Sequence, residues 1–243
     1  MHTRSHTSSD LEHRTNIQSM FDLVAPRYDL MNDLMSFATH RLWKRRFAQL
    51  APPPSQGLNS GLSTGLAVDL AGGTGDIARH LNKRGWRVVV CDPSAAMMQA
   101  GRSKDTTDIS WVAGLGEHLP FTDHSVDVLT VSFGLRNMTR PNDALCEALR
   151  VLKPGGCFLC LEFSTPTAWL RPFYNWHSRH IIPRLGAMVA GRREAYEYLV
   201  ASIREFPDQE TLKAQMQAAG FQTVTYENLS FGIAAIHIGT KAL

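Results

Sequence analysis

The stretch Ala67-Val-Asp-Leu-Ala-Gly-Gly-Thr-Gly-Asp76 decides the fold of this chain. Its apolar first half predicts a buried strand, and the glycines that follow predict a tight turn leading into a helix. Glycines at such a turn let the backbone approach a ligand closely, and the helix that follows directs free N–H groups at it. A strand, a glycine turn and a helix in this order are typical of α/β domains that bind a nucleotide-like cofactor.

Strand and helix patterns alternate from this stretch onward, which predicts a doubly wound, Rossmann-like α/β fold. Several strand-like runs lack polar alternation, as expected of parallel strands covered on both faces. These runs occupy residues 66–71, 87–92, 109–113, 126–133 and 157–163. Helical patterns occupy residues 76–83, 94–103 and 144–153.

Two signals near the end of the chain complete the prediction. The sequence Lys153-Pro-Gly-Gly156 predicts a helix stop followed by a turn. A last helix at 208–219 precedes strand runs at 224–229 and 233–239, and their short link predicts an antiparallel hairpin at the edge of the sheet.

The chain length of 243 residues fits one α/β domain and leaves little room for a second. Composition divides it into a disordered tail at 1–16, an N-terminal helical cap at 17–50, a Pro/Gly/Ser-rich linker at 51–65 and a main domain at 66–243. Within the main domain, residues 164–207 lie between the fifth strand and the last helix and are predicted to form a lid over the site.

Charge and composition exclude several classes of protein. A formal net charge of +3 is too small to argue for a nucleic-acid partner. No apolar run approaches the ~18 residues that a membrane-spanning helix needs, and the N-terminus lacks the apolar core of a secretory signal. The sequence therefore predicts a cytoplasmic protein.

The cysteines and the paired histidines do not predict a metal site. Cys91 and Cys157 lie in apolar runs, which indicates free thiols in a reducing compartment. Cys157 and Cys160 are three apart on a strand, so they point to opposite faces. His177 and His180 share a helical face but have no acid near them, which favours solvated side chains over a metal pair.

The glycine loop alone leaves the cofactor open. Residues 73–78 satisfy the dinucleotide fingerprint, and Asp92 ends the second strand, where a carboxylate accepts hydrogen bonds from ribose hydroxyls. A nicotinamide oxidoreductase, and a tight turn in a non-enzymatic interaction module, are both open interpretations. Asp76 at the start of the helix would repel a pyrophosphate. S-adenosylmethionine has a ribose diol, a positive sulfonium and an ammonium group but no phosphate, so it has no such conflict.

Several stretches resemble the ubiquinone/menaquinone biosynthesis C-methyltransferases, which are class I S-adenosylmethionine-dependent methyltransferases. The specific ones are Tyr28-Asp-Leu-Met-Asn-Asp33, Gly134-Leu-Arg-Asn137 and the block at 196–209, and the resemblance runs from about residue 20 to 241. It implies methyl transfer from S-adenosyl-L-methionine to a ring carbon of a prenylated quinol, either demethylmenaquinol or a 2-methoxy-6-polyprenyl-1,4-benzoquinol. A class I methyltransferase acting on another small aromatic or lipid-like acceptor is the alternative.

The resemblance also implies residue roles. Arg136 and Asn137 are implied as the catalytic pair, and their place after the fourth strand puts them at the edge where α/β sheets bind ligands. The implied cofactor-binding residues are Gly73, Thr74, Gly75, Asp92, Leu115, Gly116 and Ser132. No metal is required.

The sequence departs from the family pattern at two positions. Leu115 stands where the family usually has Asn or Asp, so a polar contact to adenine is predicted to be lost or made by the backbone. Ala38 replaces a usual glycine.

The predicted lid has an unusual composition. No acid lies between Glu162 and Glu194, whereas the stretch contains five arginines and several aromatic residues. Basic residues beside interfacial aromatics suit a surface that touches anionic lipid, which predicts a peripheral contact at the inner membrane face. An ordinary solvated basic face is the alternative, and a homodimer remains open.

Overall fold

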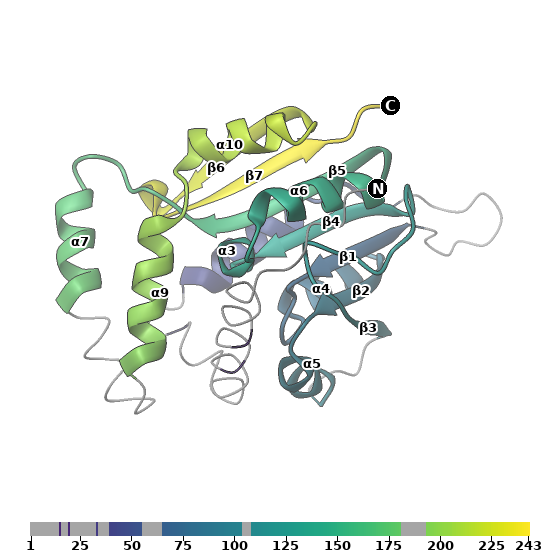
Figure 1. The fold of residues 1–243 in the computed structure, drawn as a ribbon, viewed down its shortest axis with the longest axis horizontal. Coiled ribbons are helices and arrows are strands. Elements are labelled where there is room, and N and C mark those ends of the chain that lie inside the picture. The colour runs from purple at the N-terminus through teal and green to yellow at the C-terminus, as the bar shows by residue number, and fades with distance from the viewer. Residues whose placement is uncertain are drawn as a thin grey trace.

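The computed structural model describes residues 15, 19, 33, 39–54, 65–103, 108–180 and 193–243. Within them, seven strands form one sheet in the order β3-β2-β1-β4-β5-β7-β6 (Figure 1). The strands are β1 (Leu66–Leu70), β2 (Arg87–Asp92), β3 (Ile109–Ala113), β4 (Val126–Ser132), β5 (Leu152–Phe163), β6 (Gln222–Leu229) and β7 (Ala234–Thr240). The first five are parallel, and β7 runs antiparallel to β5 and β6. The predicted Rossmann-like fold with an antiparallel C-terminal hairpin is confirmed.

The helices begin where the sequence supplies a cap. The Ser94 hydroxyl accepts from the Met97 amide (3.1 Å) at the start of α5, and the Asp208 carboxylate accepts from the Thr211 amide (2.9 Å) at the start of α10. The helices are α3 (Thr39–Leu50), α4 (Asp76–Asn82), α5 (Ala95–Arg102), α6 (Pro141–Val151), α7 (Arg171–His180), α9 (Arg193–Glu205) and α10 (Gln209–Ala218). The expected helix at 144–153 begins earlier, because Pro141 suits the first turn of a helix.

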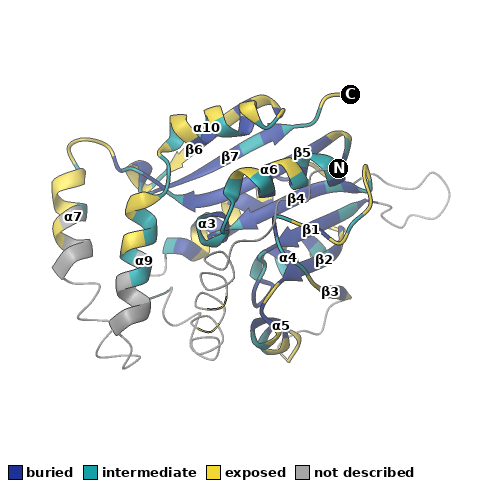
Figure 2. Cartoon of the chain, viewed as in Figure 1, coloured by how far each residue is buried: buried dark blue, intermediate teal, exposed yellow. Residues whose placement is uncertain are grey.

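The core has two halves, one on each face of the sheet, because neighbouring strand residues point in opposite directions. Val68 packs with Leu145 of α6 on one face, and Ala67 packs with Phe47 of α3 and Leu81 of α4 on the other. The strands inside the sheet are accordingly buried along most of their length, whereas the edge strands β3 and β6 are largely exposed or half-buried (Figure 2). Each large apolar side chain buried in this way contributes ~1.5–3 kcal/mol.

The cysteines are free thiols, and three of the four are buried. Cys157 belongs to one half of the core and Cys160 to the other, as their spacing on a strand predicts. Burial raises the pKa of Cys157 to about 11, so the thiol is protonated at neutral pH. Among the described residues, no group of three or more His, Cys, Asp or Glu side chains is arranged to hold a metal ion.

The turn predicted at residues 153–156 is wrong as stated, because these residues belong to β5. Val126 of β4 pairs with Leu152 of β5, and Val128 pairs with Cys157. The chain therefore advances five residues along β5 (152 to 157) where it advances two along β4 (126 to 128), which makes a bulge in β5. This bulge places Gly155 at a φ of 73°, where a side chain would be strained. The Pro-Gly-Gly signal is therefore accommodated inside a bulged strand, where the Gly156 carbonyl accepts from the Lys241 amide (2.9 Å).

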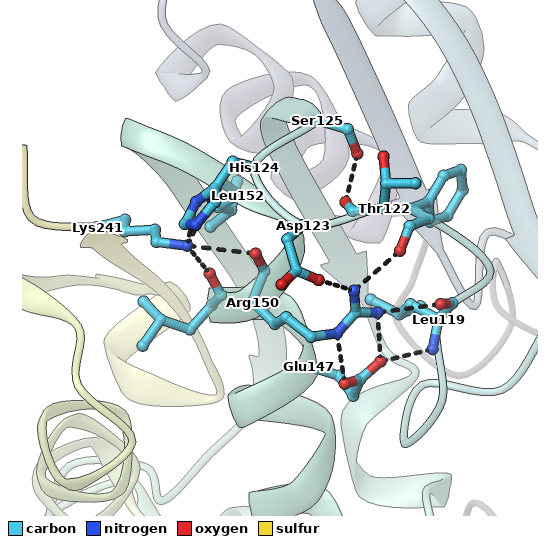
Figure 3. A network of polar contacts seen from close by, with 11 residues as sticks. Leu119, Thr122, Asp123, His124, Ser125, Glu147, Arg150, Leu152 and Lys241 are labelled. Carbon is cyan, nitrogen blue, oxygen red and sulfur yellow. Dashed lines mark hydrogen bonds and ion pairs between the residues drawn. The ribbon is translucent and has the colours of Figure 1, made fainter.

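A polar clamp fixes the segment between the site and β4 (Figure 3). Arg150 of α6 donates to both carboxylate oxygens of Glu147 (2.7 and 2.8 Å) and to the carbonyls of Leu119 (3.1 Å) and Phe121 (3.0 Å). Glu147 in turn accepts from the Leu119 amide (2.9 Å). These bonds hold residues 119–121 against α6 and so fix the loop that begins at β3 and passes the site.

Helices α7 and α9 form the described part of the predicted lid. Figure 1 shows them beyond the carboxyl ends of the parallel strands. On the other side of the sheet from α6, α3 packs against α4 and is what the structure describes of the predicted cap, apart from residues 19 and 33. The predicted tail, apart from residue 15, and most of the predicted linker lie outside the described residues.

Candidate active site

The glycine turn brings the ends of β1 and β2 together. Gly73 has a φ of 53°, and its amide donates to Asp92 Oδ2 (2.8 Å). The other oxygen of Asp92 accepts from the Ser94 amide (2.8 Å), so one buried carboxylate ties together the loops after both strands. A residue with a side chain would be strained here because of this φ, and its Cβ atom would also displace Met97 Cε, which would lie 2.9 Å away.

A cavity lies over this turn at the carboxyl edge of the sheet. The empty space around it, open solvent included, amounts to about 1110 Å³. The predicted site residues that line it are Gly73, Thr74, Asp92, Leu115, Gly116, Ser132 and Asn137, whereas Gly75 and Arg136 do not.

Gly75 acts on the fold behind the cavity. It precedes α4 with a φ of 79°, and a Cβ atom there would meet the Trp111 ring at 2.8 Å. Gly116 is less constrained, since a Cβ atom there would lie 2.5 Å from Met138 Sδ, in a flexible side chain that would have to shift. Leu115 reaches the cavity, and its carbonyl accepts from the His118 amide (3.1 Å).

The Ser132 hydroxyl also lines the cavity. It is buried and has no hydrogen-bond partner among the described residues. A buried hydroxyl without a partner costs ~1–3 kcal/mol, so such a group suits a ligand contact. S-adenosylmethionine fits this set, because the cavity offers the Asp92 carboxylate for a ribose diol and, from a different strand, the Ser132 hydroxyl.

Arg136 and Asn137 lie in a short 3₁₀ helix, η2 (Leu135–Asn137), directly after β4. Asn137 faces the cavity, and its amide is held at both ends: Nδ2 donates to the Phe133 carbonyl (3.2 Å), and Oδ1 accepts from the Tyr198 hydroxyl (3.3 Å). Burial raises the pKa of Tyr198, so this phenol stays protonated and donates. Tyr198 comes from α9, so the lid contacts the predicted catalytic turn directly.

Arg136 turns away from the cavity into a buried ion pair. Its Nη1 donates to Glu162 Oε2 (2.7 Å), and the side chains of Arg136 and Glu162 are only 5% and 1% exposed. The guanidinium carbon lies 5.8 Å from the ring centre of Phe133 and 5.3 Å from that of Phe163. Phe133 lines the cavity, so the Arg136 charge lies directly behind one wall.

Helix α3 adds a cation to the wall beside the glycine turn. Lys44 Nζ donates to Asp76 Oδ2 (2.8 Å), and Arg79 Nη2 donates to Asp76 Oδ1 (2.5 Å). Burial alone would raise the pKa of Asp76, but these two cations hold it well below its usual value. Lys44 and Arg79 therefore more than neutralise Asp76. The sequence predicted that Asp76 would repel a pyrophosphate, but its charge alone does not do so in the folded protein.

His40 and the buried acid Asp69 lie close to the same wall. Burial lowers the pKa of His40 to about 4, and His40 does not line the cavity. Burial raises the pKa of Asp69 to about 7, although it accepts from Thr130 Oγ1 (3.0 Å) and the Ala78 amide (3.1 Å). Three residues that sequence reasoning did not assign to the site, Lys44, Glu162 and Tyr198, thus contribute to it, whereas the side chains of Tyr196, His177 and His180 lie outside the described part.

Comparison with sequence families gives one model that spans nearly the whole chain. The model of the ubiE/COQ5 methyltransferase family matches residues 8–241. A protein of Rubrivivax gelatinosus named ubiquinone/menaquinone biosynthesis C-methyltransferase UbiE is 55% identical over 231 residues, which cover 95% of this chain and 89% of that protein. A protein of the same name from Ruegeria sp. is 44% identical over 244 residues, which cover 97% and 94%.

Solved structures share the fold at low sequence identity. Haemonchus contortus phosphoethanolamine N-methyltransferase 2, in complex with phosphomonomethylethanolamine and S-adenosylhomocysteine, matches with a TM-score of 0.60 and 13% identity over 83% of this chain and 52% of that chain. The [4+2]-cyclase SpnF matches with a TM-score of 0.65 and 17% identity over 93% and 95%. Because these two differ in activity, the architecture by itself does not fix the reaction.

Proposed function

The chain belongs to the ubiE/COQ5 methyltransferase family, and from that premise we propose which of its residues bind the cofactor and which act on the acceptor. Its activity is S-adenosylmethionine-dependent C-methylation in quinone biosynthesis. The proposed acceptor is the ring of a prenylated quinol, demethylmenaquinol or 2-methoxy-6-polyprenyl-1,4-benzoquinol. The names of the relatives support this choice.

The cofactor residues follow from the donors and acceptors around the glycine turn. S-adenosylmethionine supplies an electrophilic methyl group when it is bound. In the proposal, Asp92 accepts from the ribose hydroxyls, because its buried carboxylate lines the cavity at the end of β2. Ser132 supplies the hydroxyl that has no partner in the protein, and Thr74, Leu115 and Gly116 line the adenosyl pocket.

The acceptor carbon becomes nucleophilic only when the ring carries negative charge. Removal of a phenolic proton, by a water molecule or a carboxylate, pushes electron density onto the ortho carbon. We assign Asn137 to the phenol oxygen, because its amide faces the cavity and is fixed at both ends. Arg136 contributes positive potential through the Phe133 wall and holds the turn, and Glu162 fixes its position.

The observation that carries this assignment is the Asn137 amide held between the Phe133 carbonyl and the Tyr198 hydroxyl. Asn137→Ala should lower kcat on a soluble short-chain quinol by roughly 10- to 1,000-fold, the range for one fixed polar group. Calorimetric affinity for S-adenosylhomocysteine should stay within about threefold. Asn142→Ala on α6, which is exposed, serves as the matched control. Turnover of the Asn137 variant equal to that of the control would remove Asn137 from the mechanism.

The proposal also includes a membrane contact, because the acceptor has a lipid tail. The described part of the lid exposes Phe173 (70%) and Trp176 (59%) on α7, and Trp169 stacks edge-on against Phe231 with ring centres 5.3 Å apart. Arg171, the first residue of α7, is also exposed. None of the described helices is long and apolar enough to cross a bilayer. An aromatic face with basic neighbours suits peripheral binding to anionic lipid at the cytoplasmic face of the inner membrane.

Sedimentation with vesicles tests this contact. The protein should sediment with vesicles rich in phosphatidylglycerol at low salt and be released at high salt, because each basic residue contributes only ~1 kcal/mol. Phe173→Ser with Trp176→Ser should weaken sedimentation, whereas Leu243→Ser, at the exposed far end of the chain, should not. Unchanged vesicle binding would refute the dock, and conversion of a dimer to a monomer would identify a homodimer interface instead.

A further inference from the structure

Lys44 is a cation on the buried face of α3. It shares that face with Trp43, Phe47 and Ala48, which pack under the sheet, yet its ammonium reaches the wall of the cavity. Its side chain is only 9% exposed. A lysine in such a position is costly unless its charge is matched, so its place needs an explanation beyond helix packing.

The Asp76 carboxylate is shared between two cations. Lys44 Nζ lies 2.8 Å from Asp76 Oδ2, and Arg79 Nη2 lies 2.5 Å from Asp76 Oδ1. The acids Asp33 and Asp69 also act on Lys44 electrostatically. Lys44 is therefore held at the cavity by neighbouring acids, one of which it shares with Arg79.

The rest of the cavity has the opposite sign. Among the described residues that line it, Lys44 is the sole cation, whereas the acids are Asp69, Asp76, Asp92 and Glu117. A carboxylate that enters this cavity has one favourable partner and several unfavourable ones. S-adenosylmethionine carries such a carboxylate at the end of the molecule remote from its adenine.

The acid and the lysine lie on either side of the glycine turn. Asp92 ends β2, while Lys44 lies against α4, which follows the neighbouring strand β1. A ribose held at Asp92 leaves the amino-acid portion to extend over the glycine turn toward Asp76 and Lys44. We propose that Lys44 binds the carboxylate of the methionine portion, sharing its ammonium between that carboxylate and Asp76.

This inference rests on the proposed cofactor site and makes the N-terminal helix part of it. It differs from a purely structural role, in which Lys44 only joins α3 to α4. The two roles separate when the ligand loses its carboxylate, because a structural defect weakens every adenosyl ligand to a similar extent. A carboxylate partner matters only for the ligand that carries the carboxylate.

The test is calorimetry on the full-length protein with two probes, S-adenosylhomocysteine and its decarboxylated analogue, which keeps the amine and the thioether. The wild type should bind S-adenosylhomocysteine roughly 10- to 100-fold more tightly, the range for a hydrogen bond to a charged group. Lys44→Met should lose most of that preference and keep its affinity for the analogue within about twofold. Lys44→Arg should retain part of the preference, since the charge remains.

Arg46→Met is the matched control, because Arg46 lies on the same helix but forms an exposed pair with Glu227. A wild type that binds both probes equally would overturn the proposal without any variant. Equal loss of both probes in Lys44→Met would show a structural role and also overturn it. A wild type that binds neither probe would refute the proposed cofactor site itself, and the role of Lys44 would fail with it.

Discussion

Removal of Glu162 should destabilise the fold more than any exposed charge substitution. This carboxylate is 1% exposed and accepts from Arg136 Nη1 (2.7 Å), the Arg136 amide (3.2 Å) and the Phe163 amide (3.2 Å). Glu162→Ala leaves the guanidinium buried without a counter-charge, and its Nε already lacks a partner among the described residues. Removal of one partner of a buried ion pair costs ~3–5 kcal/mol, which is a large share of the ~5–15 kcal/mol free energy of unfolding of a typical protein.

Conservative and paired variants separate the charge from the packing. Glu162→Gln keeps the shape and one acceptor, so its cost should fall to ~1.5–3 kcal/mol, the worth of hydrogen bonds to a charged group. Arg136→Met with Glu162→Leu removes both charges and should recover most of the lost stability, since apolar replacement of a buried pair is often neutral. The double variant should nevertheless stay slow in turnover, because the positive potential behind Phe133 is gone.

Urea unfolding without cofactor measures these differences, provided that all variants share one slope against denaturant. Arg46→Met is the control, because its partner Glu227 is 38% exposed and surface pairs contribute only ~0–1 kcal/mol. A cost below ~1 kcal/mol for Glu162→Ala would refute the argument from burial. Simple addition of the two single-variant costs in the double variant would refute the pairing itself.

Two further substitutions test the site and its support. Ser132→Ala should weaken S-adenosylhomocysteine by roughly 2- to 10-fold in calorimetry, the worth of one hydrogen bond, without lowering the urea midpoint. His40→Gln should remove a pH dependence: the folded pKa of His40 is about 4 against 6.5 unfolded, so its contribution is complete above about pH 6.5 and is lost as pH falls toward 4. The difference in unfolding free energy between wild type and His40→Gln should therefore shrink by up to about 3 kcal/mol over that window, whereas parallel curves would contradict it.

The buried strands could be predicted closely because burial acts locally. Residues 87–92 match β2 at both ends, since a covered parallel strand needs a nearly unbroken apolar run. Residues 109–113 also match β3, although this edge strand is largely exposed or half-buried. The bulge at residues 153–156 could not be predicted, because Pro-Gly-Gly has the same local chemistry in a turn and in a bulge. Its outcome depends on pairing with the C-terminal tail at Lys241, which no local pattern encodes.

The same distinction holds for the site. Asp92 and Ser132 could be placed from the sequence because they follow strands whose carboxyl ends meet at one edge of the sheet. Lys44, Glu162 and Tyr198 have their partners 32, 26 and 61 residues away, at Asp76, Arg136 and Asn137. The one local signal was the acid at 162, since a carboxylate within an apolar strand run indicates a buried pair.

The charges that line the cavity favour S-adenosylmethionine over a dinucleotide, but not because of Asp76 alone. Asp76 alone does not repel a pyrophosphate, because Lys44 and Arg79 together outweigh it. The wall as a whole is nevertheless negative: even with Asp69 partly protonated, Asp76, Asp92 and Glu117 outnumber Lys44 among the residues that line the cavity. A cleft lined mainly by one sign of charge concentrates ligands of the other sign. The combined charge of the residues that line the cavity therefore favours a sulfonium cofactor over a dinucleotide. In the proposal, the one anionic group of that cofactor, its carboxylate, binds at Lys44.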